Sequence, residues 1–474
     1  MHQVTLIEGD GIGPEVIQAT QRLIAATGIP LTWEKCEAGK RVFEKGLSSG
    51  VPPETIASLK KTKVALKGPL ETPIGYGEKS ANVTLRTLFD TYANIRPVRT
   101  LPGIPTPFQD RAIDFVIIRE NVEDVYAGIE YMQTPTTAEA LKLITRKGSE
   151  DIIRLAFEFA RAESRRKIHC ATKANILKLT EGLFKSVFEE VAKDYPDIEA
   201  HHILIDNCAH QMVVNPEQFD VIVTTNLHGD IISDLGSGLV GGLGVAASAN
   251  IGNEVAIFEA VHGSAPDIAG KNWVNPTATF FSSIAMLRHL GEFEGAHRIE
   301  QALLYTLERS PEKTRDLDKT SSLTTTAFTD RVIENLGRTT SFWPSRPYSP
   351  LHIPSKASPP PPVVEKTIGV DIFLESTLSP TALGESLEAL CHTSPFQLKM
   401  ISNRGVQVYP TIEDLHPTTV THWRARFFFK EGERDDDLLL DFIKHIAHHH
   451  PWMHIEKLKE FNQKPGFTKT QGEA

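Results

Sequence analysis

The chain has few cysteines, and their spacing gives no sign of a cluster. Its four cysteines, Cys36, Cys170, Cys208 and Cys391, are spread over 474 residues, with no C-x-x-C pair among them. Nothing in this spacing indicates a disulfide framework or a cysteine-based zinc site. Cys170 and Cys208 are interpreted as small core residues. The pattern favours a reducing compartment, and we expect the cytoplasm.

Long apolar runs and an excess of positive charge are also missing. The N-terminus reads MHQVTLIEGDGIGPEV, whose apolar stretch is too short for a signal peptide or a transmembrane helix. Acidic residues number 60 and basic residues 50, a net charge of −10 that disfavours nucleic acid or an anionic membrane as partner. The length allows two or three domains with a large core.

The N-terminal glycines do not form a dinucleotide-binding fingerprint. They are spaced G-x-G-x-G at Gly9, Gly11 and Gly13, whereas that fingerprint requires G-x-G-x-x-G. We interpret them as a plain turn between a strand at 4–7 and a helix that begins at Pro14. Further strand-like runs alternate with amphipathic stretches and predict an α/β fold. These runs lie at 64–66, 115–118, 203–205 and 221–223, and the amphipathic stretches at 152–162 and 177–192.

A proline-rich segment separates the last part of the chain. Eight of the 22 residues at 341–362 are proline, which predicts an extended, semi-rigid linker. Beyond it, a domain at 363–474 shows the order β-α-β-β-α-β, the ferredoxin-like signature. The expected elements are strands at 367–374, 422–429 and 453–461, helices at 380–390 and 437–448, and a strand or hairpin at 397–409 that turns at Asn403-Arg404-Gly405.

Charged side chains in the first two thirds of the chain suggest binding sites. Three arginines on separate segments, Arg86, Arg96 and Arg119, suit a substrate with several carboxylates, because guanidinium pairs with carboxylate bidentately. Asp230 and Asp234 are four residues apart and share one face if a helix begins there. Such a pair suits Mg²⁺ or Mn²⁺, although it is also common at a solvated helix start. The histidines 445 and 448–450 are interpreted in that second way, as a solvated helix end.

Several motifs in order resemble one family. The stretch 259–272, EAVHGSAPDIAGKN, is similar to the adenosine-binding loop of the β-decarboxylating dehydrogenases, the isocitrate and isopropylmalate dehydrogenase family. The segments SANVTLR at 80–86 and NLHGDIISD at 226–234 add to the resemblance, which covers about residues 1–338. It implies a non-Rossmann α/β fold with a large domain at 1–91 and 241–338 and a small domain with a dimer clasp at 92–240. The tail resembles the longer isocitrate dehydrogenases.

The resemblance also implies the roles of individual residues in the oxidative decarboxylation of isocitrate to 2-oxoglutarate. Substrate would be bound by Thr72, Ser80, Asn82, Arg86, Arg96 and Arg119, and protons would be transferred with Tyr126 and Lys173. The metal would be held by Asp230 and Asp234 together with Asp206 of a neighbouring subunit, so a homo-oligomer with shared sites is expected. The adenosine side of NAD would be bound by His262, Gly263, Ala265, Asp267, Ile268 and Asn275.

The pair Asp267-Ile268 favours NAD over NADP. Members of the family that use NADP typically carry Lys-Tyr at this place, and those that use NAD carry Asp-Ile. A carboxylate accepts hydrogen bonds from ribose hydroxyls but repels a 2′-phosphate, by roughly 4 kcal/mol per charge pair at about 4 Å and an effective dielectric constant near 20. The segment 313–319 also lacks a Tyr-x-x-x-Arg arrangement that would bind the phosphate.

Other substrates and a non-catalytic role are alternatives to isocitrate dehydrogenase activity. Homoisocitrate or 3-isopropylmalate are other candidate substrates, but Ser80 and Asn82 are polar where an isopropyl group would need apolar contacts. A catalytically silent regulatory paralogue would lack some of the site residues, whereas this sequence has all the substrate, metal and acid–base residues named above. For the C-terminal domain we expect a role in assembly rather than effector binding.

Overall fold

The contacts of this computed structural model divide the chain into two units. It describes residues 1–72, 80–343, 346–354, 362–411, 417–431, 434–471 and 473. Unit 1 comprises 1–128 and 142–357, and unit 2 comprises 129–141 and 358–474. In the described part of the chain, no helix has the length and apolarity that a membrane crossing requires.

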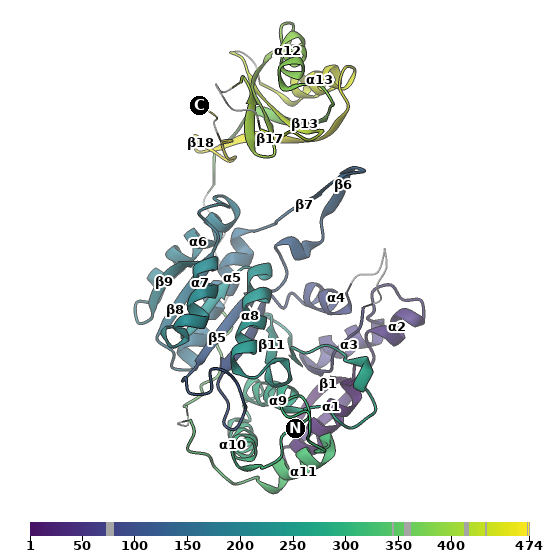
Figure 1. Cartoon of the computed structure of the whole chain (residues 1–474), viewed down its shortest axis with the longest axis vertical. Helices are drawn as coiled ribbons and strands as arrows, with labels where there is room; N and C mark the ends of the chain where they lie inside the picture. Colours follow the sequence, from purple (N-terminus) through teal and green to yellow (C-terminus); the bar gives the residue numbers. More distant parts are fainter. Residues whose placement is uncertain are drawn as a thin grey trace. The chain divides into compact units, whose positions relative to one another are not determined.

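Unit 1 is built on one mixed sheet of ten strands (Figure 1). Its order is β2-β1-β3-β12-β11-β4-β5-β10-β8-β9. The pairs β12–β11, β11–β4 and β4–β5 are antiparallel, and the other pairs are parallel. The strands are β1 (His2–Ile7), β2 (Leu31–Cys36), β3 (Val64–Lys67), β4 (Ala93–Arg99), β5 (Asp114–Glu120), β8 (Lys167–Thr172), β9 (Glu199–Leu204), β10 (Val221–Thr224), β11 (Ala247–Ile251) and β12 (Ala256–Ala260). The predicted α/β class is confirmed.

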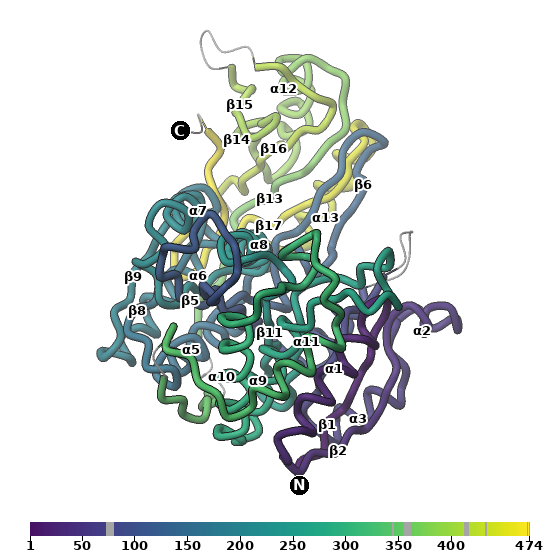
Figure 2. The backbone as a smooth tube through the Cα atoms, turned by 60° about the horizontal axis from the view of Figure 1, so that its bottom comes forward, coloured from purple at the N-terminus to yellow at the C-terminus, as the bar shows by residue number. Residues whose placement is uncertain are grey.

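Helices cover both faces of this sheet, as the tube in Figure 2 also shows. Alternate residues of β5 mark the two faces: Val116 and Ile118 pack in the cluster of α5 and α6, and Phe115 and Ile117 in the cluster of α7 and α8. The helices are α1 (Gly13–Ala25), α2 (Lys40–Glu44), α3 (Pro53–Thr62), α4 (Ala81–Leu88), α5 (Arg146–Ala162), α6 (Thr180–Val191), α7 (Ile205–Val214), α8 (Asn226–Val240), α9 (Thr277–His289), α10 (Phe293–Arg309) and α11 (Thr325–Glu334). Both faces being buried explains why the strands read as short apolar runs.

The strand predicted at 203–205 has different bounds in the structure. Strand β9 begins at Glu199 and ends at Leu204, and Ile205 is the first residue of α7. Because β9 lies at the edge of the sheet, its first three residues are exposed and include no large apolar side chain, so they gave no apolar signal.

Unit 2 contains an antiparallel sheet in the order β15-β14-β16-β13-β17-β18. Its elements are β13 (Glu365–Glu375), α12 (Pro380–Cys391), β14 (Phe396–Asn403), β15 (Val406–Tyr409), β16 (His422–Phe429), α13 (Asp436–Ala447), β17 (Trp452–Phe461) and β18 (Lys464–Pro465). The central order β14-β16-β13-β17, with both helices packed on one apolar core, is the ferredoxin-like arrangement, as predicted. The hairpin turns where expected, at Arg404 and Gly405, whose φ angles are 50° and 82°.

A second hairpin, distant in sequence, belongs to the same unit. It consists of β6 (Glu130–Thr134) and β7 (Thr137–Ala140), which pair antiparallel with each other. Its contacts group it with the C-terminal sheet rather than with the residues that precede and follow it.

The described part of the proline-rich segment packs on unit 1. The indole Nε1 of Trp343 donates to the carbonyl of Thr100 at 2.7 Å, and Arg346 pairs with Asp114 at 2.5 Å. The guanidinium of Arg288 lies 3.4 Å from the ring centroid of Tyr348. These contacts hold Trp343, Arg346 and Tyr348 against the surface of unit 1.

Candidate active site

Polar side chains interrupt the apolar packing on one face of the ten-stranded sheet. Asn94 donates to Ser248 at 2.7 Å and to Asn250 at 2.8 Å, and Asn250 donates to Glu259 at 2.8 Å. Arg96 on β4 in turn donates from Nε to Asn94 at 2.7 Å. The strip lies between two separate apolar clusters, one under α7 and α8 and the other under α2, α3 and α4. Burying polar side chains is costly unless each finds a partner, and here they pair with one another. A paired polar strip inside an apolar sheet face is therefore a candidate site.

Arginines from β4 and β5 meet carboxylates at the start of α8. Arg96 donates to Ser233 at 2.6 Å and to Asp234 at 3.2 Å, and it lies 3.5 Å from Asp230. Arg119 contacts Asp230 still more closely and is itself 1% exposed. Burial and the neighbouring Arg119 lower the pKa of Arg96 to about 10. The structure thus brings together four residues predicted from sequence.

Tyr126 joins the same cluster from the short 3-10 turn Val125–Ala127. Its hydroxyl donates to Asp230 at 2.6 Å, and the guanidinium of Arg119 lies 4.9 Å from its ring centroid. Burial, together with the hydrogen bond to Asp230, raises the pKa of Tyr126. Burial opposes ionisation of Asp230, but Arg119, the Tyr126 hydroxyl and Arg96 outweigh it and lower the pKa of that carboxyl. Asp230 is therefore an ionised acceptor beside a protonated phenol.

A buried ion network closes the other side of the strip. Lys67 at the end of β3 forms a close ion pair with Glu259 at the end of β12, and Arg86 lies 3.5 Å from the same carboxylate. Burial lowers the pKa of Lys67. Burial would raise the pKa of Glu259, but the two cations hold it below its usual range. Arg86 is thereby held at the edge of the site.

A small polar pocket opens beside this network. It has a volume of about 120 Å³, and Asn82, Arg86, Arg96 and His262 are among its lining residues. The Oδ1 atom of Asn82 and the Nε atom of Arg86 are buried and have no hydrogen-bond partner. The unpaired Arg86 Nε donor suits a carboxylate and the unpaired Asn82 Oδ1 acceptor suits a hydroxyl, so the pocket fits a ligand that carries both groups.

The other two predicted substrate residues lie at the borders of described segments. Ser80 is the N-cap residue of α4, but its side chain makes no capping hydrogen bond, so its hydroxyl is not committed to the helix. Thr72 is half-buried. Residues 73–79 lie outside the described part of the chain.

Lys173 and Asp206 form a pair of their own. The ammonium group of Lys173 donates to Asp206 at 2.9 Å, and this bond lowers the pKa of the carboxyl. Among the residues that the structure describes, Asp206, Asp230 and Asp234 do not converge into one group of ligand atoms. A three-carboxylate metal site formed by one chain alone is therefore not present in the described residues.

The loop at 261–275 packs against the glycine-rich N-terminal turn. The amide of Ile12 donates to the carbonyl of Ser264 at 2.8 Å, and a Cβ on Gly11, which has a φ of +57°, would lie only 2.0 Å from that oxygen. Gly11 is therefore needed for the close backbone approach between this turn and the loop. The contact joins the N-terminal turn to the loop predicted to bind the cofactor.

Within this loop the predicted cofactor-binding residues differ in whether their side chains already have partners within the chain. The Nε2 atom of His262 is buried without a partner, which leaves it available to a ligand. Asn275 is committed, because it donates to Asp316 at 3.0 Å and accepts from the amide of Thr277 at 3.0 Å. Gly263, Ala265 and Asp267 are exposed, and Ile268 packs against the main core.

Two cations lie against the ring of Trp273, which follows Asp267 in the same loop. The guanidinium of Arg315 lies 4.0 Å from the ring centroid of Trp273, and the ammonium of Lys271 lies 5.4 Å from it. Two positive charges therefore lie against the Trp273 ring in the loop that contains Asp267.

Several residues of the site were not predicted from sequence. They are Lys67, Asn94, Asn226, Ser233, Ser248, Asn250 and Glu259, all polar and buried. Asn226 accepts from Nε of Arg119 at 3.0 Å and lies one turn before Asp230 on α8, so its place in the NLHGD motif was an available signal. Glu259 opens the EAVHG motif. Lys67 had no comparable signal.

The cysteines lie in the core as predicted, but the prediction of a solvated helix end is wrong for His450, which is buried. Cys170 and Cys208 are buried, and burial raises the pKa of both thiols. Among the described residues, histidines 445 and 448–450 do not form a metal-binding group with one another. His450 instead shares a hydrogen bond of 2.9 Å with Ser386.

Comparisons with known proteins place these observations in a family. Residues 3–332 match the family model described as isocitrate/isopropylmalate dehydrogenase, and residues 365–473 match the model described as bacterial isocitrate dehydrogenase, C-terminal domain. The chain is 58% identical over 477 residues to a Thermus thermophilus protein named isocitrate dehydrogenase (NADP), covering 99% of this chain and 96% of that protein. It is 46% identical over 338 residues, 71% of this chain and 90% of the relative, to a Kluyveromyces lactis protein named isocitrate dehydrogenase (NAD) subunit 2, mitochondrial. A crystal structure of the TT0538 protein from Thermus thermophilus superposes with a TM-score of 0.95 at 57% identity, covering 100% of this chain and 96% of that one.

Proposed function

Because the chain belongs to the isocitrate/isopropylmalate dehydrogenase family, we propose that it oxidises and decarboxylates isocitrate to 2-oxoglutarate and CO₂, with NAD as hydride acceptor. The observation that carries the choice of substrate is the pocket lined by Asn82, Arg86 and Arg96. Its unpaired Asn82 Oδ1 and Arg86 Nε atoms favour a polar, charged substituent over an isopropyl group, since each buried polar atom left unpaired costs about 1–3 kcal/mol.

In the proposed reaction, Arg86, Arg96 and Arg119 bind the substrate carboxylates. Arg96 and Arg119 are held by hydrogen bonds to Asn94 and Asn226, so their guanidinium groups are oriented before substrate arrives. Such preorganisation lowers the barrier, because the enzyme does not have to reorder these dipoles during the reaction.

Tyr126 is proposed to deliver a proton after CO₂ leaves. Its hydroxyl is protonated and bonded to Asp230 at 2.6 Å, so the proton is held at a defined position. Lys173 of the partner subunit is proposed to act in proton removal from the 2-hydroxyl. These two roles come from the family resemblance and from the ionisation of the groups around them.

A divalent cation fits the carboxylates of the site. Asp230 is ionised, and two aspartates in successive turns of α8, with Asp206 of the partner subunit, offer the hard oxygen ligands that Mg²⁺ or Mn²⁺ prefers. When bound, such an ion would supply Lewis-acid chemistry at the 2-oxygen of the substrate. This arrangement requires at least a homodimer, which we propose as the functional unit.

NAD is the proposed acceptor because of the exposed carboxylate of Asp267. Its repulsion of a 2′-phosphate, at most roughly 4 kcal/mol before screening by salt, would favour the cofactor that lacks this group. The unpartnered Nε2 atom of His262 supports cofactor binding at the same loop.

NADP is the second candidate, and two observations favour it. Lys271 and Arg315 bring positive charge to Trp273 in the same region, and the Thermus thermophilus relative at 58% identity carries NADP in its name. Either cation would attract a 2′-phosphate, so the balance between them and Asp267 decides the preference.

Initial rates with isocitrate and Mg²⁺, followed at the absorbance of the reduced nicotinamide, test the proposal. NAD and NADP are compared in parallel, and the Asp230→Asn variant serves as the control that loses activity. NAD-selective turnover is expected. NADP-selective turnover would keep the reaction and refute the cofactor assignment. No turnover of isocitrate, with turnover of 3-isopropylmalate or homoisocitrate, would refute the substrate.

A further inference from the structure

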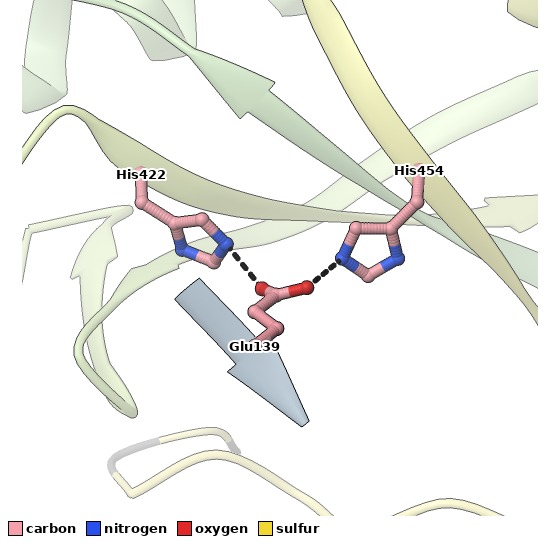
Figure 3. Close-up of side chains that lie close together, drawn as sticks. All are labelled: Glu139, His422 and His454. Atoms are coloured by element: carbon pink, nitrogen blue, oxygen red, sulfur yellow. Dashed lines mark hydrogen bonds and ion pairs between the residues drawn. The ribbon is translucent and has the colours of Figure 1, made fainter. Parts of the chain in front are cut away.

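Three side chains of unit 2, from strands far apart in sequence, converge on one point. His422 is the first residue of β16, His454 lies on β17, and Glu139 lies on β7 of the hairpin. In Figure 3 the carboxylate of Glu139 lies between the two imidazole rings. Strand β13 separates β16 from β17 in the sheet, and the two rings lie over its residue Phe373.

The three ligand atoms lie close enough together for small side-chain rotations to admit a metal ion. His422 Nε2 lies 2.6 Å from one carboxylate oxygen of Glu139, and His454 Nε2 lies 2.8 Å from the other. All three ligand atoms lie within 4.8 Å of one another. Tetrahedral zinc with bonds of about 2.0–2.2 Å spaces its ligands by roughly 3.4 Å. Rotations that move these atoms by about 1 Å would therefore admit an ion.

The rings are held in the orientation that presents Nε2 to the shared point. The ring of His454 stacks on Phe373, with centroids 3.9 Å apart and an interplanar angle of 15°. Its Nδ1 atom faces Glu456 at 4.0 Å, and Gln133 donates to the Glu139 carboxylate at 3.0 Å. Outer carboxylates and amides of this kind orient the ligands of protein metal sites.

One nitrogen of the group has no satisfactory hydrogen bond. The Nε2 atom of His454 is buried, and although Glu139 is close, the geometry does not give it a hydrogen-bond partner. This nitrogen therefore points at the Glu139 carboxylate without a hydrogen bond of good geometry. The side chains of His422, Glu139 and His454 nevertheless keep 19%, 26% and 28% exposure, so an ion from solvent can reach them.

We propose that Glu139, His422 and His454 form a binding site for a zinc-class transition-metal ion, with one coordination position left to water. Two imidazoles and one carboxylate suit Zn²⁺, Co²⁺ or Ni²⁺ better than Mg²⁺, which prefers oxygen ligands. The ion would tie the hairpin 130–140 to the C-terminal sheet by joining β7 to β16 and β17. This site uses none of the residues proposed to act on the substrate.

Metal titration of the full-length protein tests this site. The protein is stripped with a chelator and kept in excess Mg²⁺, which occupies the aspartate site, before Zn²⁺ is added in a calorimeter. One Zn²⁺ per chain is expected, with an affinity that falls by more than about tenfold in His422→Asn, His454→Asn and Glu139→Gln. Co²⁺ in place of Zn²⁺ should give visible absorption bands typical of imidazole ligation in the wild type.

Other histidines of the same unit provide the matched control. His445 and His449 stand close together on and just after α13, with ring centroids 5.4 Å apart, but without Glu139. A His445→Asn/His449→Asn variant should bind Zn²⁺ as the wild type does. Zn²⁺ should also slow amide hydrogen exchange in residues 130–140 of the wild type and of this control, but not of Glu139→Gln.

Three results would overturn the proposal. They are the absence of Zn²⁺ binding in excess Mg²⁺, equal binding by the wild type and the three site variants, and loss of binding in the His445/His449 control. Circular dichroism of each variant checks its fold, and Glu139→Gln, which keeps the side-chain shape, decides the outcome if a histidine variant fails to fold.

Discussion

Replacing Glu259 with glutamine should destabilise the protein more than any surface ion-pair change, because it leaves a buried ammonium without its carboxylate. Lys67 is 2% exposed, and Glu259 is its ion-pair partner. Removing one member of a buried pair typically costs about 3–5 kcal/mol. We therefore expect Glu259→Gln to lower the free energy of unfolding, measured by urea denaturation near neutral pH, by about that amount.

The cost should shrink as the pH rises. Burial lowers the pKa of Lys67 in the folded protein, and Glu259 is the chief group that opposes this shift. Without that carboxylate the folded-state pKa falls further below the unfolded value near 10.4. Between these two pKa values the unfolded chain binds more protons than the folded one. The free energy of unfolding therefore rises with pH, by up to about 1.4 kcal/mol per pH unit. The difference between variant and wild type should therefore be smaller at about pH 9.5 than at about pH 7.

The control is a matched change at the surface. Lys63 pairs with Glu254 at 2.8 Å, with 50% and 76% of the side chains exposed. Glu254→Gln should cost less than about 1 kcal/mol at both pH values. A Glu259→Gln cost as small as that of Glu254→Gln, or a cost that does not change with pH, would refute the argument that Lys67 needs Glu259 while it is charged.

Four further results are expected at the candidate active site. Asn82→Ala should lower kcat/KM for isocitrate by about 2- to 10-fold, because a hydrogen bond donated by the substrate hydroxyl to Asn82 Oδ1 is worth about 0.5–1.5 kcal/mol; unchanged kinetics would place the substrate elsewhere. Tyr126→Phe should lower kcat with little change in KM, measured by steady-state kinetics, and an unchanged kcat or a change confined to KM would contradict a role in proton transfer. Asp267→Lys/Ile268→Tyr should move the NADP/NAD ratio of kcat/KM toward NADP by more than about tenfold, or else the loop does not set the preference. Chelation of divalent ions should abolish turnover and Mg²⁺ should restore it, whereas activity that survives chelation would contradict a metal-dependent reaction.

Much of the fold follows from local sequence pattern. The α/β class came from short apolar runs, which arise because both faces of the ten-stranded sheet are covered by helices. The ferredoxin-like order of the C-terminal domain came from the alternation of strand and helix patterns. Its hairpin turn was predicted at Asn403-Arg404-Gly405, and glycine readily accepts a positive φ angle such as the 82° of Gly405.

The element order, the family motifs and the residue types of the catalytic and cofactor-binding candidates thus follow from local pattern, because these depend on near neighbours in the chain. Which polar residues are buried together depends instead on how the strands are arranged in space. Lys67 and Glu259 are 192 positions apart and meet because β3 and β12 are parallel neighbours. Glu139 meets His422 and His454 because a hairpin packs with a sheet more than 200 residues away in the chain. No local pattern encodes such pairs, since each depends on strand order and register, and these are set by the packing of the whole sheet.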